Sequence, residues 1–280
     1  MRNKTGLNIL IYLLLFLAGD LVSGLFFDIL FRFIHLPMSE LYIIPRKLGA
    51  FLMIVLLFWL YTKKVLHMDM RDFGITCKLK TWSVIMAVLL PAYVVAVYCM
   101  IGKTQLHAAP SDQVIAIIVL AVLIALKSGI TEEMLFRGFI MKLMEKRWNK
   151  AVAIVAPSFL FALVHIPSME TITIAGVLLL IISGTLVGVM FSLAAYKEHS
   201  IANSAIIHII WNLFFVTDIL RITTAEGAYG NPLISIIIPS DNMLITGSGF
   251  GIEASLISAA GYAVVCIVIC LMRKKKEEKE

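Results

Sequence analysis

Residues 113–146 read QVIAIIVLAVLIALKSGITEEMLFRGFIMKLMEK, an apolar run that contains two adjacent glutamates and an arginine. About 20 apolar residues in a helix cross the hydrocarbon layer of a bilayer, because each residue adds about 1.5 Å. This segment is longer than one crossing requires, so we expect its helix to tilt or to protrude into the cytoplasm before Trp148. The segment predicts a membrane span that carries ionisable groups.

The rest of the chain has a composition that suits the same class of protein. The 280 residues are 60% hydrophobic and 15% charged, whereas a soluble globular protein is roughly 45–50% apolar and about 25% charged. A soluble fold of this length needs a polar exterior that these residues do not provide. The composition excludes a soluble protein and predicts a single integral membrane domain over residues 1–280.

Further apolar runs are separated by short polar links, so we expect an all-α, polytopic membrane helix bundle with about eight transmembrane helices. The expected spans are 7–33, 48–62, 82–101, 113–146, 151–167, 173–196, 201–220 and 252–272. The link 221–251 carries an apolar run, Leu233–Ile238, between two prolines. This run is too short to cross a bilayer, and we interpret it as a re-entrant or interfacial element.

Lysine and arginine residues in the links predict the orientation of the chain. If eight spans alternate, most of these residues fall on one side, so both termini are expected to be cytoplasmic. They are Arg2, Lys4, Lys63, Lys64, Arg71, Lys78, Lys80, Lys142, Lys146, Arg147, Lys150, Lys197 and Arg273 through Lys276. Residues 273–280 are expected to form a charged cytoplasmic tail. This placement explains the net charge of +6, and no nucleic-acid partner is expected.

The span 113–146 contains the first cluster of ionisable residues: Glu132, Glu133 and Arg137. A charge at the centre of a bilayer costs about 2.5–3.5 kcal/mol even on the lenient insertion scale, so such residues are functional candidates. Adjacent helical residues project about 100° apart, and residues four apart share a face. Glu133 is therefore expected to pair with Arg137, which leaves Glu132 to point elsewhere. An ordinary ion pair at a helix surface is the structural alternative.

Two further spans carry polar residues one helical turn apart: Phe161 with His165, and His208 with Asn212. Each pair lies on one helix face, so His208 and Asn212 can direct hydrogen-bonding groups at the same point. The structural alternatives are a core histidine for the first pair and polar contacts between helices for the second.

Acidic residues also occur in the first span, but no histidine accompanies them. Asp28 and Arg32 are spaced for a local ion pair, and Asp20 has no evident partner in the sequence. We expect these residues to have a structural role.

The three clusters together supply the groups that amide hydrolysis needs. A glutamate in a low-dielectric site can take a proton from water and return it to a leaving amine. His208 and Asn212 can donate hydrogen bonds to the oxyanion. Glu132, His165 and His208 are also a ligand set that zinc accepts, although no His-Glu-x-x-His helix occurs. We slightly prefer the metal-free mechanism, because paired neutral donors suit an oxyanion better than a cation.

The order of the three motifs is similar to that of a known family. The family pattern is Glu-Glu-x-x-x-Arg, then Phe-x-x-x-His, then His-x-x-x-Asn on successive membrane helices, and this chain has all three in that order. The chain resembles the CPBP intramembrane proteases, also called the CAAX protease and bacteriocin-processing or Abi family, which includes the Rce1-type prenyl-protein endopeptidases. The strings EEMLFRGFIMKLM, SFLFALVHIP and SAIIHIIWNLF carry this resemblance. It covers residues 112–220, which are the expected catalytic core.

By position, the resemblance implies that Glu132 activates the attacking water and that His165 helps to position it. It further implies that His208 and Asn212 stabilise the tetrahedral oxyanion. The remaining motif residues are implied to support the site; they are Glu133, Arg137 and Phe161. The family is often described as one of metalloproteases, and a glutamate mechanism without metal has been argued for the Rce1 type.

The expected function is that of an intramembrane endopeptidase that hydrolyses a peptide bond of a membrane-associated protein or peptide. The alternative is a non-catalytic bacteriocin-immunity or membrane-regulatory protein that uses the same polar residues structurally. The expected location is the plasma membrane of a bacterium. No sequence feature outside the core marks prenyl recognition, and none indicates an oligomeric state.

Overall fold

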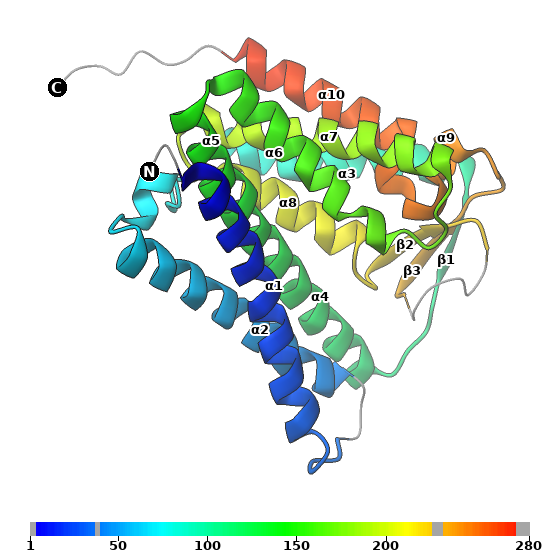
Figure 1. Cartoon of the computed structure of the whole chain (residues 1–280). Coiled ribbons are helices and arrows are strands. Elements are labelled where there is room, and N and C mark those ends of the chain that lie inside the picture. The colour runs from blue at the N-terminus through cyan, green and yellow to red at the C-terminus, as the bar shows by residue number, and fades with distance from the viewer. Residues whose placement is uncertain (1–3, 37–39, 226–231, 273–280) are drawn as a thin grey trace.

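The computed structural model describes residues 4–36, 40–225 and 232–272, and most of them are helical (Figure 1). The helices are α1 (Thr5–Leu30), α2 (Glu40–Leu60), α3 (Thr81–Ile101), α4 (Ser111–Glu133), α5 (Met141–Arg147), α6 (Lys150–Val164), α7 (Ile174–Lys197), α8 (Ala202–Phe215), α9 (Met243–Thr246) and α10 (Leu256–Leu271). The strands are β1 (Lys103–Leu106), β2 (Leu220–Thr223) and β3 (Ile234–Ile237). The expected tail 273–280 lies outside the described residues.

Within the described residues, six helical segments are long and apolar enough to cross a membrane. They are Thr5–Leu30, Leu41–Val65, Thr81–Ile101, Ser111–Arg147, Lys150–Ser168 and Ile174–Lys197. The helices α8 and α10 occupy the other two expected places but have only 14 and 16 residues. The mostly helical membrane fold is confirmed, and the count of eight crossings stays a prediction.

The apolar surface of α1 shows why this bundle belongs in lipid. Six leucines of this helix are more than half exposed; they are Leu7, Leu10, Leu14, Leu17, Leu21 and Leu25. Their spacing of three and four residues places them along one helix face. An apolar face of this length without a protein neighbour is matched by the hydrocarbon of a bilayer.

The fourth span is a single helical rod, as its length indicated. Ser111–Arg147 comprises 37 residues, or about 55 Å at the helical rise per residue, which exceeds a bilayer core of about 30 Å. Residues Met134–Ile140 within it are wound as a π-helix. Such wide turns in α-helices occur frequently at functional sites.

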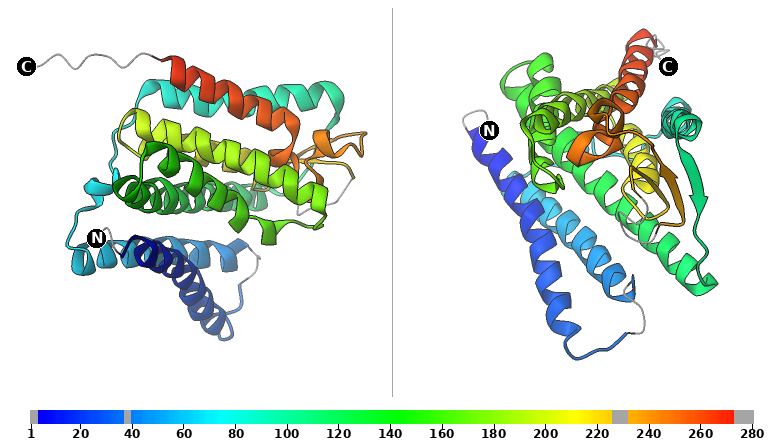
Figure 2. Two further views of the ribbon diagram at one scale, coloured as in Figure 1. Left: turned by 45° about the horizontal axis from the view of Figure 1, so that its top comes forward. Right: turned by 90° about the vertical axis from the view of Figure 1, so that its right-hand side faces the viewer.

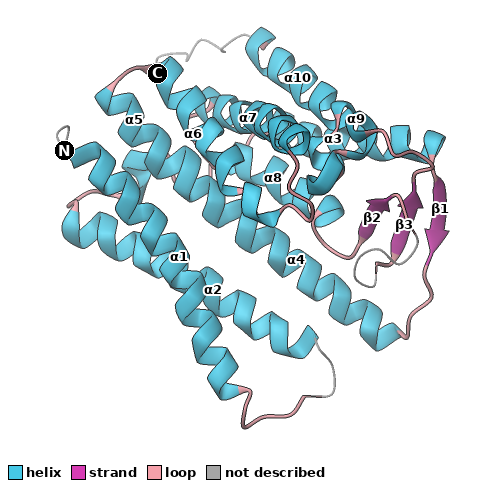
Figure 3. Ribbon diagram, turned by 45° about the vertical axis from the view of Figure 1, so that its right-hand side comes forward, coloured by secondary structure: helices cyan, strands magenta, loops and turns pink. Residues whose placement is uncertain are grey.

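A small sheet corrects the expectation of an all-α fold. The strand order is β1-β3-β2, with β1 antiparallel and β2 parallel to β3 (Figure 3). The run Leu233–Ile238, which was expected to be a re-entrant or interfacial element, is mainly strand β3. Its residues Ser235 and Ile236 are buried in the sheet. The run is too short for a buried helix but matches the length of a strand. One partner strand, β1, lies in the link between α3 and α4, and the other, β2, lies in the same link as β3.

Small residues allow α6 and α7 to pack closely. Gly184 and Gly188 lie one turn apart on α7, and a Cβ at Gly188 would lie 2.8 Å from the Cα of Ser158 on α6. Small residues at this spacing let two helix backbones approach each other in a membrane. The approach also presents the Gly188 carbonyl to the interior of the bundle.

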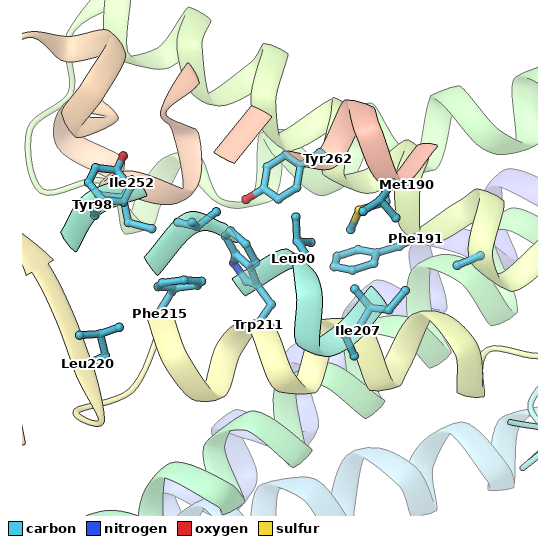
Figure 4. Packing of buried hydrophobic residues seen from close by; sticks show 14 of the residues in the cluster. Leu90, Tyr98, Met190, Phe191, Ile207, Trp211, Phe215, Leu220, Ile252 and Tyr262 are labelled. Carbon is cyan, nitrogen blue, oxygen red and sulfur yellow. The ribbon is translucent and has the colours of Figure 1, made fainter. Parts of the chain in front are cut away.

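A cluster of buried apolar residues joins α3, α7, α8 and α10 to the sheet. Trp211 and Phe215 of α8 face Leu90 of α3 and Tyr262 of α10 (Figure 4). Trp211 and Tyr262 meet edge to face at a centroid distance of 5.1 Å. This packing holds α8, which carries the third sequence motif, between two other spans.

The bundle has two different ends. The start of α1 and the end of α10 lie at one end, and the sheet lies at the opposite end (Figure 2, left). Figure 1 shows the same arrangement, with β2 as the strand nearest to the helices. The link between α3 and α4, which contains β1, therefore lies beside the link that follows α8, which contains β2 and β3.

Candidate functional site

The helices α4 and α8 approach closely at Gly129. A Cβ at this position would lie 3.0 Å from the main-chain nitrogen of Ile209 and 2.5 Å from its side chain. Because Gly129 lacks a Cβ, the α8 backbone can lie against the turn that precedes Glu132. The motif residues His208 and Asn212 of α8 are thereby brought to the glutamates of α4.

Glu133 is buried and binds two cationic or polar partners. Arg137 Nη1 donates to Glu133 Oε1 at 2.7 Å, and both side chains are 0% exposed, so the ion pair expected from the sequence is confirmed. His208 Nδ1 lies 3.1 Å from the same oxygen. Arg137 Nη2 donates to the Gly188 carbonyl at 3.1 Å. Glu133 therefore connects α4 to α8, and Arg137 connects the π-helical segment that follows α4 to α7.

This contact decides which nitrogen of His208 faces the site. A carboxylate accepts hydrogen bonds, so Nδ1 carries a proton that it donates to Glu133. The other ring nitrogen, Nε2, lies 3.8 Å from Glu132 Oε2. A neutral His208 therefore presents a lone pair at Nε2, and only the doubly protonated ring can donate a hydrogen bond from there.

One aromatic ring stacks on His208, and a cation packs against that ring. The Phe191 ring lies nearly parallel to the His208 ring, with centroids 4.7 Å apart. The Arg137 guanidinium lies 5.1 Å from the Phe191 centroid and 4.7 Å from the Phe161 centroid. Phe161 thus packs directly on Arg137, which accounts for its place in the second motif.

The second histidine is oriented by its own helix. His165 Nδ1 lies 2.6 Å from the Phe161 carbonyl oxygen, so it donates to that oxygen. The Phe161 and His165 rings are 4.5 Å apart. As in His208, Nε2 is the ring nitrogen that remains for a ligand or a water molecule.

Asn212 is held by α4. Its Nδ2 donates to Ser128 Oγ at 2.8 Å, and Ser128 Oγ donates to the Ile124 carbonyl at 2.8 Å. An amide nitrogen has two hydrogens, so the second hydrogen of Nδ2 is available to a bound group. The sequence predicted that Asn212 shares a helix face with His208, but it did not predict the contact of Asn212 with Ser128.

All four residues expected to be catalytic line one cavity of about 450 Å³. They are Glu132, His165, His208 and Asn212. Glu132 Oε2 has no hydrogen-bond partner among the described residues, whereas Glu133 does not line the cavity. The volume lies in the range of small-molecule and peptide sites. The arrangement offers a carboxylate, two ring nitrogens and an amide to one bound group.

Two acidic residues that line this cavity, Glu170 and Glu253, were not among the site residues predicted from the sequence. Glu253 Oε1 accepts a hydrogen bond from Trp211 Nε1 at 2.7 Å, and Tyr262 donates to the Glu253 carbonyl at 3.0 Å. Glu170 lies in the loop between α6 and α7, where burial raises the pKa of its carboxyl and Arg221 opposes the shift. The only feature of the sequence that could have indicated Glu253 is that it is an isolated acidic residue at the start of an apolar run.

The residues present do not fit a zinc ion as they are arranged. Among the residues that the structure describes, no three histidine, cysteine, aspartate or glutamate side chains converge as a metal ion requires. Both histidine rings contact the Phe161 ring, with centroid distances of 4.5 Å for His165 and 6.0 Å for His208. Glu132, His165 and His208 share a cavity without forming a tetrahedral set.

The acidic residues of α1 are paired differently from the sequence expectation. Asp28 binds Arg46 of α2 at 2.9 Å and not Arg32, and Asp20 has a partner, Lys127 of α4, at 2.5 Å. Both partners are distant in sequence, which is why local spacing did not reveal them. These pairs attach α1 to α2 and to the helix that carries Glu132.

The fold and the site together define a polytopic membrane protein with a glutamate, two histidines and an asparagine around one internal cavity. Residues 113–214 match the family model described as type II CAAX prenyl endopeptidase Rce1-like. This match confirms the resemblance to the CPBP and Rce1-like proteases for the segment that contains all three motifs. No curated protein and no solved structure matches the chain significantly.

Proposed function

We propose that this protein is an intramembrane endopeptidase that cleaves a membrane-associated protein or peptide with a water molecule activated by Glu132. The observation that carries the proposal is that Glu132, His165, His208 and Asn212 line one cavity. The family match at the level of proteases supports it. The proposed catalytic core is residues 112–220 within a single membrane domain.

In the proposed reaction, the Glu132 carboxylate takes a proton from water while the water oxygen bonds to the substrate carbonyl carbon. His165 positions the water through Nε2, since its Nδ1 is bound to the Phe161 carbonyl. The carbon–nitrogen bond then breaks, and the proton held by Glu132 passes to the leaving amine. The products are one free carboxyl group and one free amine.

The oxyanion of the tetrahedral intermediate needs donors, and we assign this role to two groups. Asn212 Nδ2 has a second hydrogen beside its bond to Ser128. His208 donates from Nε2 only as the imidazolium, whose charge Glu133 offsets through Nδ1. We therefore assign His208 an electrostatic role as a cation in the transition state, with Glu133 and Arg137 holding it in place.

The Glu132→Gln variant tests the assigned base. Glutamine keeps the shape of the side chain but cannot accept the proton, so turnover of the purified enzyme should fall by about 10²–10⁴-fold. The protein level and the helix content should stay unchanged. Peptides from membranes of cells with the wild type and with the variant, compared by mass spectrometry, should then reveal the substrate.

The matched control is Glu145→Gln, which changes a glutamate of the same helical rod that pairs with Lys142 outside the cavity. This control should keep near-normal turnover. Near-normal turnover of Glu132→Gln would contradict the assigned base. No cleavage by the wild type or by either variant would favour the non-catalytic alternative.

A further inference from the structure

The geometry points to β2 as a docking edge for substrate: we propose that the substrate binds as an extended peptide strand along the free edge of β2, which leads from the surface into the cavity. This inference rests on the proposed function and specifies how that site receives its substrate. The edge is formed by the main chain of β2, and Ile222 is its central residue.

The pairing of β2 shows which main-chain groups face outward. Ile234 N–H donates to the Ile219 carbonyl at 3.1 Å, and Ile238 N–H donates to the Thr223 carbonyl at 2.8 Å. Main-chain groups along a strand alternate between its two edges. Those of residues 219, 221 and 223 face β3, so those of Leu220 and Ile222 face away from it. In the part of the chain that the structure describes, β2 has β3 as its one strand neighbour.

The outward edge of β2 borders the cavity. Both Arg221 and Ile222 line it, together with Glu132, His165 and Asn212. Successive side chains of a strand point to opposite faces, so a cavity that touches both residues extends around the edge between the faces. Figures 1 and 3 show β2 as the strand on the helix side of the sheet, with β1 on the far side.

An extended peptide suits this edge for energetic reasons. Much of the cavity wall is apolar, including Phe161, Leu180 and Phe215. A peptide whose bond is to be cleaved must expose its main chain, and main-chain groups without partners in an apolar site cost several kcal/mol each. A free strand edge supplies such partners regardless of the side chains of the peptide.

The direction of β2 also suits this role. The strand follows directly from the end of α8, where Asn212 lies, and α8 and β2 are in contact. A peptide beside β2 therefore has one end at the proposed oxyanion donors and the other near Thr223. This geometry links the binding edge to the proposed site of cleavage.

The Ile222→Pro variant tests the edge. Proline removes the outward N–H of residue 222 and places its ring on the edge, but it leaves the bonds to β3 intact because these involve the neighbouring residues. The probe is a library of fluorophore–quencher decapeptides rich in Val, Leu and Phe, from which the peptide that binds best is taken. Binding to protein that carries Glu132→Gln is measured by fluorescence anisotropy, and cleavage by the otherwise wild-type protein is measured separately.

Ile222→Pro should weaken peptide binding about tenfold or more, as expected when a buried hydrogen-bond partner is lost. One control variant, Leu106→Pro, should stay within about threefold of the parent protein. Leu106→Pro places proline on the opposite edge of the same sheet, where Leu106 is 80% exposed and its main chain faces away from β3, because its neighbour His107 bonds Leu233.

Singly N-methylated versions of the selected peptide provide a second measurement on protein without changes in β2. If the peptide pairs with β2, methylation should weaken binding at every second residue of the bound segment, since alternate N–H groups face the strand. This measurement decides the question even if Ile222→Pro fails to fold.

The results separate the two proposals. Equal binding by Ile222→Pro and the parent protein, an equal loss in Leu106→Pro, no alternation with N-methylation, or no binding of any library peptide would overturn the strand edge. Binding that depends on Ile222 without cleavage by the wild type would support the edge while contradicting the proposed peptidase function.

Discussion

Glu132 and Glu133 are adjacent in the chain but have different surroundings. Glu133 is fully buried between Arg137 and His208, whereas Glu132 lines the cavity. The angle of about 100° between neighbouring helical residues causes this separation. One glutamate can therefore orient His208 while the other is free to exchange protons.

The protonation of His208 connects this pair to the question of a metal. Because Nδ1 donates to Glu133, Nε2 can be a metal ligand in the neutral ring or a donor in the imidazolium. The described residues do not form a metal-binding group, and we prefer the second role. The zinc content of the purified protein, measured beside its turnover, tests this choice.

We expect His165→Ala and His208→Ala to abolish turnover without changing the zinc content of the purified protein, which should stay at background in all forms. The content is measured by inductively coupled plasma mass spectrometry. His107→Ala is the matched control, because His107 contacts Ser235 in the sheet and does not line the cavity. Stoichiometric zinc in the wild type that is lost together with activity in His208→Ala would contradict the metal-free mechanism.

At the scale of elements, the contact between α6 and α7 helps to position the residues of the candidate site. Gly188 allows the two backbones to meet at Ser158 and offers its carbonyl to Arg137. Arg137 in turn binds Glu133, which orients His208. A change in the distance between α6 and α7 should therefore reach the catalytic residues through Arg137.

The Gly188→Ala variant should lower the free energy of unfolding by about 1–3 kcal/mol, the usual cost of overpacking a close contact. The added Cβ would meet backbone and side-chain atoms of Ser158 at 2.7–2.8 Å. Thermal unfolding in detergent measures the loss, and turnover should fall as well. Gly6→Ala is the control, since a Cβ there has no neighbour within 4 Å, and it should keep or raise the melting temperature. Equal stability of both variants would refute the close-packing argument.

At the scale of the whole molecule, the two ends of the bundle differ in charge and in structure. The links that hold Lys63, Lys64, Lys146 and Arg147 are those expected on the cytoplasmic side, and the sheet lies at the other end (Figure 2). We propose that the protein lies in a bacterial plasma membrane with both termini cytoplasmic. Strand β2 and the rest of the sheet would then lie toward the outer side.

Cysteine labelling in intact cells tests this orientation. In a background without the four native cysteines, a membrane-impermeant maleimide should label Asp241→Cys, beyond β3, and should not label Trp148→Cys, between α5 and α6. Both positions are exposed, so each should react once the membrane is permeabilised. Labelling of both in intact cells, or of Trp148→Cys alone, would contradict the proposed topology.

The sequence by itself determined the properties that depend on local periodicity. The apolar runs placed the helices, because a membrane helix must satisfy its own main chain and present apolar side chains to lipid. The i,i+4 spacing predicted the Glu133–Arg137 pair, which the structure confirms. The three motifs also named four of the residues that line the cavity, since residues one turn apart must share a helix face.

Only the tertiary structure decided the contacts between distant segments. The bond of His208 to Glu133, the partners of Asp20 and Asp28, and the sheet built from two separate links all join residues far apart in the chain. Such contacts depend on how the helices pack, which small residues such as Gly129 and Gly188 control through the distance between backbones. Helical periodicity predicts the face on which a side chain lies, and packing decides which other segment that face meets.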